Sequence, residues 1–260
     1  MSQYRKYGAA PFSVAVLHGG PGAPGSAAGL AQGLGKRFGV LEPYQSKYSV
    51  SGQVEELRDF LLDKARLPAS IVGWSWGAWL GYLLAAEYPE LVKQLVLVCS
   101  GPFEESYAQS ILKTRLERLE NAERREVEDI QATMSLPGSG NQDALLARFG
   151  KLLSKADSFD PLPDTEEEIR VQADLHTSIW SEARELRADG SLLALGNRIR
   201  CPVAAIHGKD DPHPYQGVKE PLEGVLGDFT FILLARCGHA PWKERQAKEQ
   251  FFLELEKILT

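Results

Sequence analysis

Short apolar segments alternate with longer segments of helical periodicity along most of the chain. Several apolar segments are rich in β-branched residues and apolar at nearly every position, as in parallel strands that are covered on both faces. The predicted strands span residues 13–17, 39–42, 70–72, 94–99, 203–206 and 230–235. Helices are predicted over residues 27–37, 54–65, 76–87 and 243–259. Such an alternation predicts right-handed βαβ units and an α/β fold with a doubly wound, mostly parallel sheet.

The alternation breaks off between residues 102 and 190, where strand patterns are lacking. From residue 113 to residue 129, 11 of 17 residues are charged, and apolar residues recur at helical spacing. This stretch predicts one amphipathic helix with a solvated face. Thr165 and Glu168 match a capping box, which predicts the start of another helix that Gly190 would end.

We therefore expect two domains, a core of residues 1–101 and 191–260 and a helical cap of residues 102–190. The cap is inserted after a predicted strand and would lie over the C-terminal ends of the sheet, where open α/β folds bind ligands. Because the predicted sheet lies outside the cap, deleting the cap is expected to leave a folded core and to change substrate choice.

Composition narrows the class of protein. The 260 residues suffice for one large α/β domain or for a domain with an insertion. The net charge of −6 argues against a nucleic-acid partner. Apolar segments stay well short of the roughly 20 residues of a membrane span, and the first residues lack a signal-peptide pattern. An odd number of cysteines favours free thiols. We expect a cytoplasmic protein with neither a membrane nor a nucleic-acid partner, and the oligomeric state stays open.

A glycine-rich corner carries the first candidate for chemistry. Residues 72–79 read Val-Gly-Trp-Ser-Trp-Gly-Ala-Trp and connect a predicted strand to a predicted helix. The flanking glycines would let strand and helix approach closely, so that Ser75 is presented above the sheet as a nucleophile. The backbone N–H of Trp76 would face a developing oxyanion. The alternative is a glycine-rich turn whose serine only caps the helix.

A serine nucleophile needs a base, and the base needs an acid that orients it. His239 lies just beyond the last predicted strand, and Asp210 and Asp211 follow the strand before it. The order Ser, Asp, His, with each residue at the C-terminal end of a strand, is the order of α/β-hydrolases.

The segment His-Gly-Gly-Pro-Gly at residues 18–22 follows the first long predicted strand. Its glycines permit the close backbone approach of an oxyanion hole, and Gly20 is the predicted second donor. A phosphate-binding loop is the weaker interpretation, because the Gly-x-Gly-x-x-Gly spacing and a following Lys-Ser/Thr pair are absent. His18 is expected to support this loop by hydrogen bonding rather than to bind a metal, and it is also a candidate for the substrate pocket.

Two tryptophans are further candidates for the substrate pocket. Trp74 precedes the serine and could form a wall of the site, and Trp180 could reach the pocket from the cap. Packing under or inside the cap is the alternative for both. The Trp76 side chain is equally consistent with the pocket and with packing, and Trp79 is expected in the core.

With these residues in hand, the chain resembles the α/β-hydrolase superfamily over about residues 10–100 and 191–260. The His-Gly-Gly-Pro-Gly stretch, together with Ser75-Trp76-Gly77, is similar to the prolyl iminopeptidase group in particular. Carried over by motif, the resemblance implies a triad of Ser75, Asp211 and His239, with Asp210 as the less favoured acid.

Three features depart from the iminopeptidase pattern. The Asp-Gln-Arg-Gly run of that group is replaced by residues 42–45, Glu-Pro-Tyr-Gln, and little chain precedes residue 13 for additional strands. The group's cap binds the substrate amine with acidic residues, whereas the glutamates of this cap follow no matching pattern; they are Glu104, Glu105, Glu182 and Glu185.

The predicted function is a serine hydrolase that cleaves a small ester, amide or related acyl compound through an acyl-enzyme. A proline iminopeptidase-like aminopeptidase and a non-catalytic ligand-binding protein of the same fold are the alternatives. The expected partner is a small-molecule substrate. We expect neither a cofactor nor a metal, because His176, His207 and His213 are scattered along the chain.

Overall fold

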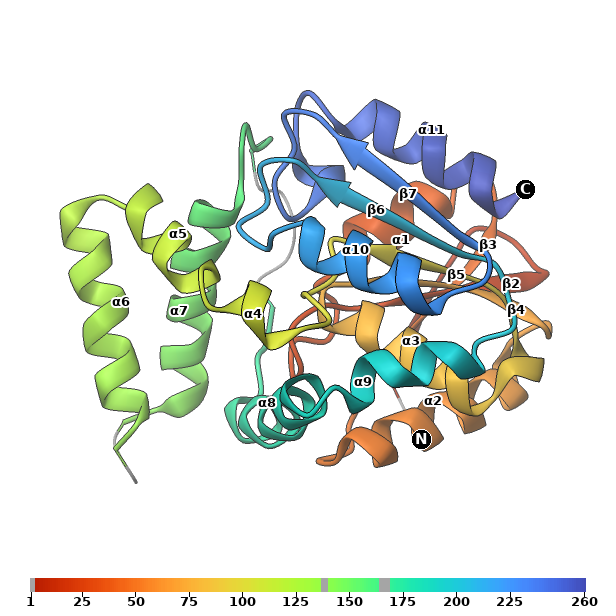
Figure 1. Cartoon of the computed structure of the whole chain (residues 1–260), viewed down its shortest axis with the longest axis horizontal. Coiled ribbons are helices and arrows are strands. Elements are labelled where there is room, and N and C mark those ends of the chain that lie inside the picture. The colour runs from red at the N-terminus through yellow and green to blue at the C-terminus, as the bar shows by residue number, and fades with distance from the viewer. Residues whose placement is uncertain (1–2, 137–139, 164–168) are drawn as a thin grey trace.

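A computed structural model describes residues 3–136, 140–163 and 169–260, and over these residues one seven-stranded sheet forms the centre of the molecule (Figure 1). Its strand order is β1-β3-β2-β4-β5-β6-β7. β1 pairs antiparallel with β3, and the other neighbouring strands pair in parallel. The strands are β1 Tyr4–Tyr7, β2 Phe12–Leu17, β3 Gly39–Pro43, β4 Ala69–Trp74, β5 Val92–Val98, β6 Val203–Gly208 and β7 Phe229–Leu234. The predicted α/β fold with a mostly parallel sheet is confirmed.

All six predicted strands are present, and β1 is the strand that the apolar pattern missed. Its sequence, Tyr-Arg-Lys-Tyr, has two adjacent basic residues and no alternation, because both basic side chains are exposed at the edge of the sheet. The Tyr7 hydroxyl donates a hydrogen bond of 2.7 Å to Glu42 Oε2 on β3. β1 is therefore held by its partner strand and by the partial burial of its two tyrosines.

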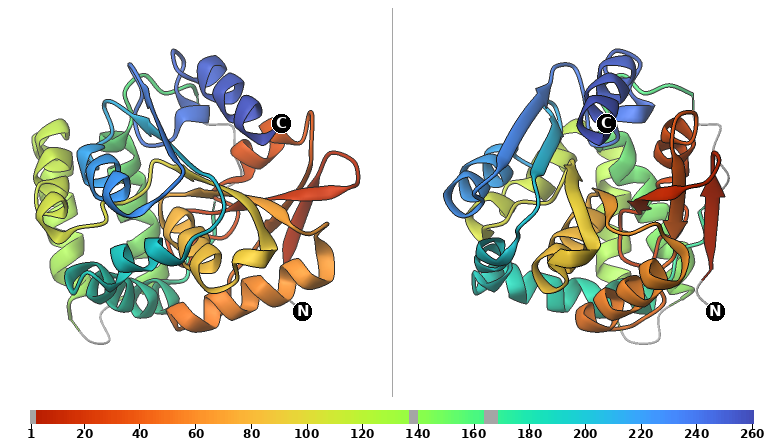
Figure 2. Two further views of the ribbon diagram at one scale, coloured as in Figure 1. Left: turned by 45° about the vertical axis from the view of Figure 1, so that its right-hand side comes forward. Right: turned by 90° about the vertical axis from the view of Figure 1, so that its right-hand side faces the viewer.

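Helices cover both faces of the sheet (Figure 2). α1 and α11 pack on one face, where alternate strand residues such as Val14 and Val16 join a common apolar cluster. α2, α3 and α10 pack on the other face, where Ala15 and Leu17 point. The helices are α1 Ala28–Leu34, α2 Val50–Lys64, α3 Trp76–Glu87, α10 Gln216–Val225 and α11 Lys248–Leu259, with a short 3-10 turn η1 at Pro89–Leu91.

The described elements between β5 and β6 are all helices, as predicted, apart from an isolated β-bridge between Pro161 and Glu244. α5, α6 and α7 enclose a small apolar cluster of their own and stand beside the sheet, whereas α8 and α9 lie below it in Figure 1 and join the apolar cluster of α2, α3 and α10. The helices are α4 Glu105–Ala108, α5 Ile111–Arg118, α6 Asn121–Met134, α7 Gln142–Asp157, α8 Ala173–Ala188 and α9 Ser191–Ala194, followed by the 3-10 turn η2 Leu195–Arg198. The division into core and cap at residues 102 and 190 stays a prediction.

The single amphipathic helix predicted from residue 113 to residue 129 is wrong, because two helices occupy this stretch. α5 ends at Arg118, and Leu119 and Glu120 adopt extended backbone angles. Glu120 and Glu123 form a capping box that starts α6, and Leu119 is buried between the helices. The charged pattern hid this break because glutamate can both cap a helix and continue one.

Of two other helix boundaries, one differs from the sequence-based prediction and one agrees with it. α11 begins at Lys248 rather than at residue 243, since Pro241–Lys243 forms the 3-10 turn η3. α8 ends just before Gly190, whose φ of 79° confirms its predicted role in ending this helix. The predicted capping box of Thr165 and Glu168 lies outside the described residues. Among the residues that the structure describes, no helix is both long enough and apolar enough to cross a membrane.

Candidate active site

Ser75 occupies the corner between β4 and α3 in a strained backbone conformation. Its φ of 54° and ψ of −115° lie outside the regions that most residues adopt. Its backbone N–H donates to the Val98 carbonyl of the neighbouring strand at 3.0 Å, and α3 begins at the next residue. Backbone strain of this kind is found at functional sites, where the surrounding structure holds it in place.

The glycines on either side of Ser75 make the corner possible. A β-carbon on Gly73 would collide with the Gly77 carbonyl, and one on Gly77 would lie 2.7 Å from the His18 carbonyl oxygen as well as against Leu17. These neighbours are backbone atoms, which cannot rotate away as a side chain could. The Gly-Trp-Ser-Trp-Gly sequence therefore follows from the close approach of β2, β4 and α3.

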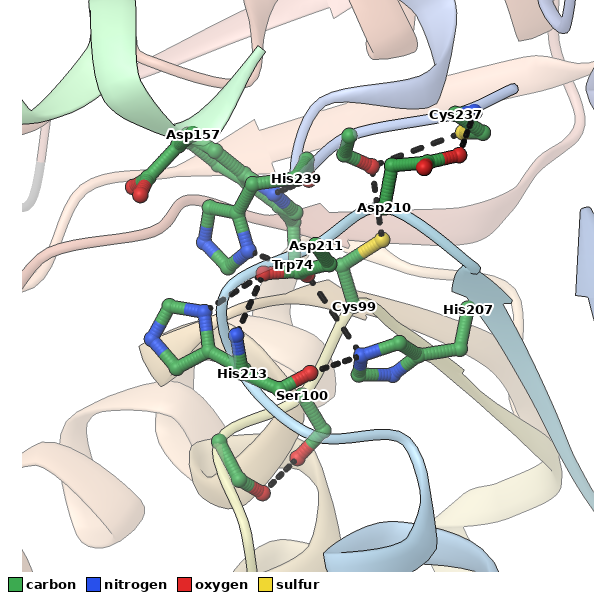
Figure 3. A network of polar contacts seen from close by, with 12 residues as sticks. Trp74, Cys99, Ser100, Asp157, His207, Asp210, Asp211, His213, Cys237 and His239 are labelled. Atoms are coloured by element: carbon green, nitrogen blue, oxygen red, sulfur yellow. Dashed lines mark hydrogen bonds and ion pairs between the residues drawn. The ribbon is translucent and has the colours of Figure 1, made fainter. Parts of the chain in front are cut away.

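The structure brings Asp211 and His239 together from two loops. Asp211 follows β6, His239 follows β7, and His239 Nδ1 lies 2.7 Å from Asp211 Oδ2 (Figure 3). Asp210 points elsewhere, because its carboxylate accepts a 3.3 Å hydrogen bond from the Cys237 backbone N–H. Of the two candidate acids, Asp211 is the one that contacts the histidine, and its role as the catalytic acid stays a prediction.

The electrostatics of this pair suit a buried base and its acid. Burial opposes the charge on His239, but the adjacent Asp211 carboxylate outweighs it, so the pKa of His239 is raised above its ordinary value. Burial also opposes the charge on Asp211, yet His239 and His213 hold the pKa of that carboxyl well below its usual range. Asp211 is thus an anion that stabilises a proton on His239.

Trp74 links the serine corner to the histidine loop. Its indole Nε1 donates a 2.8 Å hydrogen bond to the His239 carbonyl, and the two rings lie 5.4 Å apart. It also packs edge-on against Trp242 and against the backbone of Gly19. Among the described residues no hydrogen bond joins the Ser75 hydroxyl to His239. Trp74 therefore orders the loops around the serine, and its predicted place in the substrate pocket stays a prediction.

The loop after β2 presents Gly20 in a defined orientation. The Gly19 carbonyl lies 3.0 Å from His18 Nδ1 and accepts a 3.4 Å hydrogen bond from the Ser26 hydroxyl. Because a trans peptide points its N–H opposite to its C=O, these contacts fix the direction of the Gly20 N–H. Burial lowers the pKa of His18 to about 4, which keeps its ring neutral. His18 supports the loop from a buried position, and its predicted pocket role is untested.

The Trp76 backbone N–H is available as a donor because it belongs to the first turn of α3, where N–H groups have no partner within the helix. Its side chain is turned away into the core, where Nε1 donates to Gln53 Oε1 at 3.3 Å. Trp79 is buried, as expected, and Trp180 of α8 stacks on it with ring centroids 5.9 Å apart. His176 of the same helix also stacks on Trp180, with ring centroids 6.3 Å apart, so α8 packs against α3 here by aromatic contact.

Sequence reasoning missed Glu244, a buried carboxylate behind the histidine loop. It accepts hydrogen bonds from the backbone N–H groups of Gly238, Phe159 and Asp160 at 3.0, 2.9 and 2.7 Å. It therefore ties the residue before His239 to the loop that follows α7. No sequence motif marks it, because the three donors come from two distant segments.

Sequence reasoning also missed the histidines around Asp211. His213 Nδ1 lies 2.7 Å from Asp211 Oδ1, and His207 Nε2 lies 3.5 Å from Oδ2 (Figure 3). The His213 backbone N–H donates to the same Oδ1 at 2.9 Å. A usable signal was the Asp-Pro-His spacing, since an aspartate often accepts a bond from the residue two positions on.

One group of described residues has donor atoms close enough to suggest a metal site. Cys99, Asp211 and His239 each offer an atom within 4.8 Å of the others, and all three are buried. The Asp211 and His239 atoms already face each other across a 2.7 Å hydrogen bond, and burial raises the pKa of the Cys99 thiol. A neutral thiol is a poor ligand, so the cluster suits proton transfer better than metal binding.

A family model described as the Alpha/beta hydrolase family matches residues 14–251. The chain belongs to this family. The α/β hydrolase is 26% identical over 238 residues to a pimeloyl-(acyl-carrier protein) methyl ester esterase of Nitrosomonas europaea, with 87% of this chain and 88% of the relative covered. A protein of the same name from Chromobacterium violaceum is 26% identical over 241 residues, with 88% and 87% covered.

Solved structures confirm the fold of this α/β hydrolase. VinJ superposes with a TM-score of 0.69 at 17% identity, over 99% of this chain and 94% of that one. A proline iminopeptidase of Mycobacterium smegmatis superposes with a TM-score of 0.65 at 18% identity, with the same coverage. At such identities the likeness concerns the fold alone, so the predicted superfamily is confirmed and the iminopeptidase group is not.

Proposed function

We propose that this α/β hydrolase is a serine hydrolase that cleaves a carboxylic ester of a small molecule. The observation that carries the proposal is the buried Asp211–His239 hydrogen bond. Trp74 hydrogen-bonds the His239 loop and directly precedes Ser75, which is held at positive φ. Two relatives named as methyl ester esterases support an ester as the bond that is cleaved.

In the proposed mechanism Ser75 Oγ attacks the ester carbonyl while His239 Nε2 accepts the hydroxyl proton. Asp211 accepts the hydrogen bond of Nδ1–H and stabilises the imidazolium that forms. His239 then gives the proton to the departing alcohol, and the acyl group stays on Ser75. A water molecule, deprotonated by the same histidine, attacks the acyl-enzyme, and the acid product leaves with the serine restored.

The N–H groups of Trp76 and Gly20 are the proposed donors to the tetrahedral oxyanion. Both are backbone donors, one at the start of α3 and one fixed by the anchored Gly19 carbonyl. Donors that are already oriented need no rearrangement when charge develops, and each contributes on the order of 3 kcal/mol to lowering the barrier.

The glutamates of the insertion favour an ester over the aminopeptidase alternative. An aminopeptidase would need a free carboxylate for the substrate amine. Glu182 instead accepts a hydrogen bond from the Val50 backbone N–H at 2.8 Å, and Glu105 forms an ion pair with Arg187 at 2.8 Å. Glu104 and Glu185 are exposed to solvent. None of the four is thus placed as a buried and unoccupied partner for an amine.

The test is a panel of short-chain p-nitrophenyl esters, monomethyl dicarboxylates and aminoacyl-naphthylamides, with fluorophosphonate labelling of Ser75. We expect ester turnover and labelled Ser75. Preferred turnover of proline naphthylamide would replace the esterase proposal by the aminopeptidase. A protein that neither turns over an ester nor reacts with fluorophosphonate would be the non-catalytic ligand-binding alternative.

A further inference from the structure

A closed ring of polar contacts connects the proposed acid and base to the helical insertion. His213 Nδ1 lies 2.7 Å from Asp211 Oδ1, and its Nε2 lies 3.4 Å from Arg115 Nη2 on α5. Arg115 donates two hydrogen bonds, of 2.6 and 2.7 Å, to the Asp157 carboxylate at the end of α7. The Asp157 backbone carbonyl accepts a 2.8 Å hydrogen bond from the His239 backbone N–H. The hydrogen bond between His239 Nδ1 and Asp211 Oδ2 closes the ring.

The contacts of His213 define its tautomer. A guanidinium has only donors, so the Nε2 that faces Arg115 must be an acceptor, and the proton is on Nδ1, where it reaches Asp211. The pKa of His213 is lowered to about 4, chiefly by burial and also by the neighbouring His239 and Arg115, whereas Asp211 acts to raise it. At neutral pH this ring is therefore an uncharged donor.

We propose that His213 is a positioning residue, held by the Arg115–Asp157 pair in the Nδ1–H form so that the Asp211 carboxylate stays turned toward His239. The inference rests on the proposed function, because it needs His239 to act as the base. Two donors from one residue, the ring and the backbone N–H, fix Asp211 Oδ1. With Oδ1 fixed, Oδ2 remains directed at His239 Nδ1.

The neutrality of His213 matters because its ring stacks on that of His239, with centroids 4.4 Å apart. A charged His213 would repel the imidazolium that forms on His239 and would compete for the charge of Asp211. The other charged groups that act on His239 are Asp157, which favours its protonation, and Arg115, which opposes it. His207 also faces Asp211, and burial lowers its pKa, so it too stays neutral.

Two substitutions of similar size test the position of the donor. In His213→Asn the amide nitrogen takes about the place of Nδ1, whereas in His213→Gln it lies nearer the place of Nε2. We expect the Asn variant to retain most of the activity. The Gln variant should lose about 10- to 100-fold in kcat with KM unchanged, since a misplaced base acts in the transition state. In the Gln variant the acid limb of the pH profile of kcat/KM should move to lower pH, because Asp211 turns away from His239 and no longer raises its pKa.

Equal activity of the two variants would overturn the inference, whether both match the wild type or both are impaired. In the first case the donor is dispensable, and in the second the ring acts by packing. Fluorophosphonate labelling of the wild-type enzyme separates this failure from that of the proposed function. An unlabelled and inactive wild type defeats the function, whereas a labelled, active wild type with a normal Gln variant defeats only the role of His213.

The tautomer can be measured without any turnover. In the ¹⁵N-histidine-labelled wild type, we expect the His213 ring to be protonated at Nδ1 and free at Nε2 near neutral pH. The double variant Arg115→Met/Asp157→Asn removes the charged pair together and should release His213 from this tautomer. A wild-type ring protonated at Nε2 would overturn the proposal, even if the double variant does not fold.

Discussion

Single side chains decide whether the proposed site works, and Ser75 is the first of them. We expect Ser75→Ala to lower kcat by at least about a thousandfold, because the nucleophile is lost while the oxyanion donors remain. Its folding should be unchanged, since no described side-chain hydrogen bond depends on the hydroxyl. The measurement is ester turnover together with circular dichroism.

Ser154→Ala, on the exposed side of α7, is the matched control. Turnover within tenfold of the wild type would mean that another residue is the nucleophile.

The Asp211–His239 pair predicts the direction of the pH dependence. His239 must be neutral to accept a proton, so activity falls as pH decreases through its pKa, which Asp211 raises above the ordinary value of 6.5. The acid limb of kcat/KM should thus lie above pH 6.5. In Asp211→Asn the carboxylate charge is lost and burial lowers the histidine pKa, so the limb should move to lower pH while kcat falls by about 10⁴. An acid limb that does not move would contradict the pairing.

The residues that the sequence could reveal are those marked by chain order. Ser75, Asp211 and His239 each follow the end of a strand, and parallel strands bring these ends to one edge. Glu244 and Arg115 could not be found in this way. Each looks like an ordinary surface charge until the tertiary structure buries it against partners from distant segments.

At the scale of elements, the corner between β4 and α3 should tolerate no side chain at Gly77. A β-carbon there meets the backbone of Leu17 and His18, so Gly77→Ala must displace the start of the oxyanion loop. We expect a loss of about 1–3 kcal/mol in the free energy of unfolding, together with a lower kcat.

Gly150→Ala is the control for this prediction, because nothing lies within 4 Å of a β-carbon at that position in α7. It should stabilise the protein by about 0.5–1 kcal/mol, since alanine favours a helix over glycine. Urea unfolding of both variants gives the comparison. If the two variants had the same free energy of unfolding, the backbone around Gly77 would have to accommodate the added β-carbon by small shifts.

Elements with their own apolar pattern could be predicted, and elements held by a partner could not. The central strands are buried on both faces, so their residues are apolar throughout and predict strands. β1 depends on Tyr7 and β3, and its own four residues show no pattern. The break between α5 and α6 depends on burial of Leu119, which only the packing of three helices explains.

For the whole molecule, the sequence predicts a cap that can be removed, and the structure shows its helices hydrogen-bonded to the loops of the proposed acid and base. Besides the Asp157 contact with His239, Arg118 of α5 donates a 2.8 Å hydrogen bond to the carbonyl of Asp210. Yet neither apolar cluster on the sheet includes a described residue from 111 to 157. The fold and the site should therefore respond differently to loss of this segment.

Replacing residues 111–157 by a Gly/Ser linker should thus leave a folded sheet but lower turnover of every ester in the panel by about 100-fold or more, because the acid and base loops lose their support. This differs from a changed substrate choice, in which some esters would keep their rates. Folding is followed by thermal unfolding, and turnover by kcat/KM across the panel. Arg148→Ala, which breaks an exposed ion pair with Glu126 between α7 and α6, is the control and should change neither. A folded truncation that hydrolyses the smallest ester at the wild-type rate would show that the catalytic loops hold their positions without the insertion.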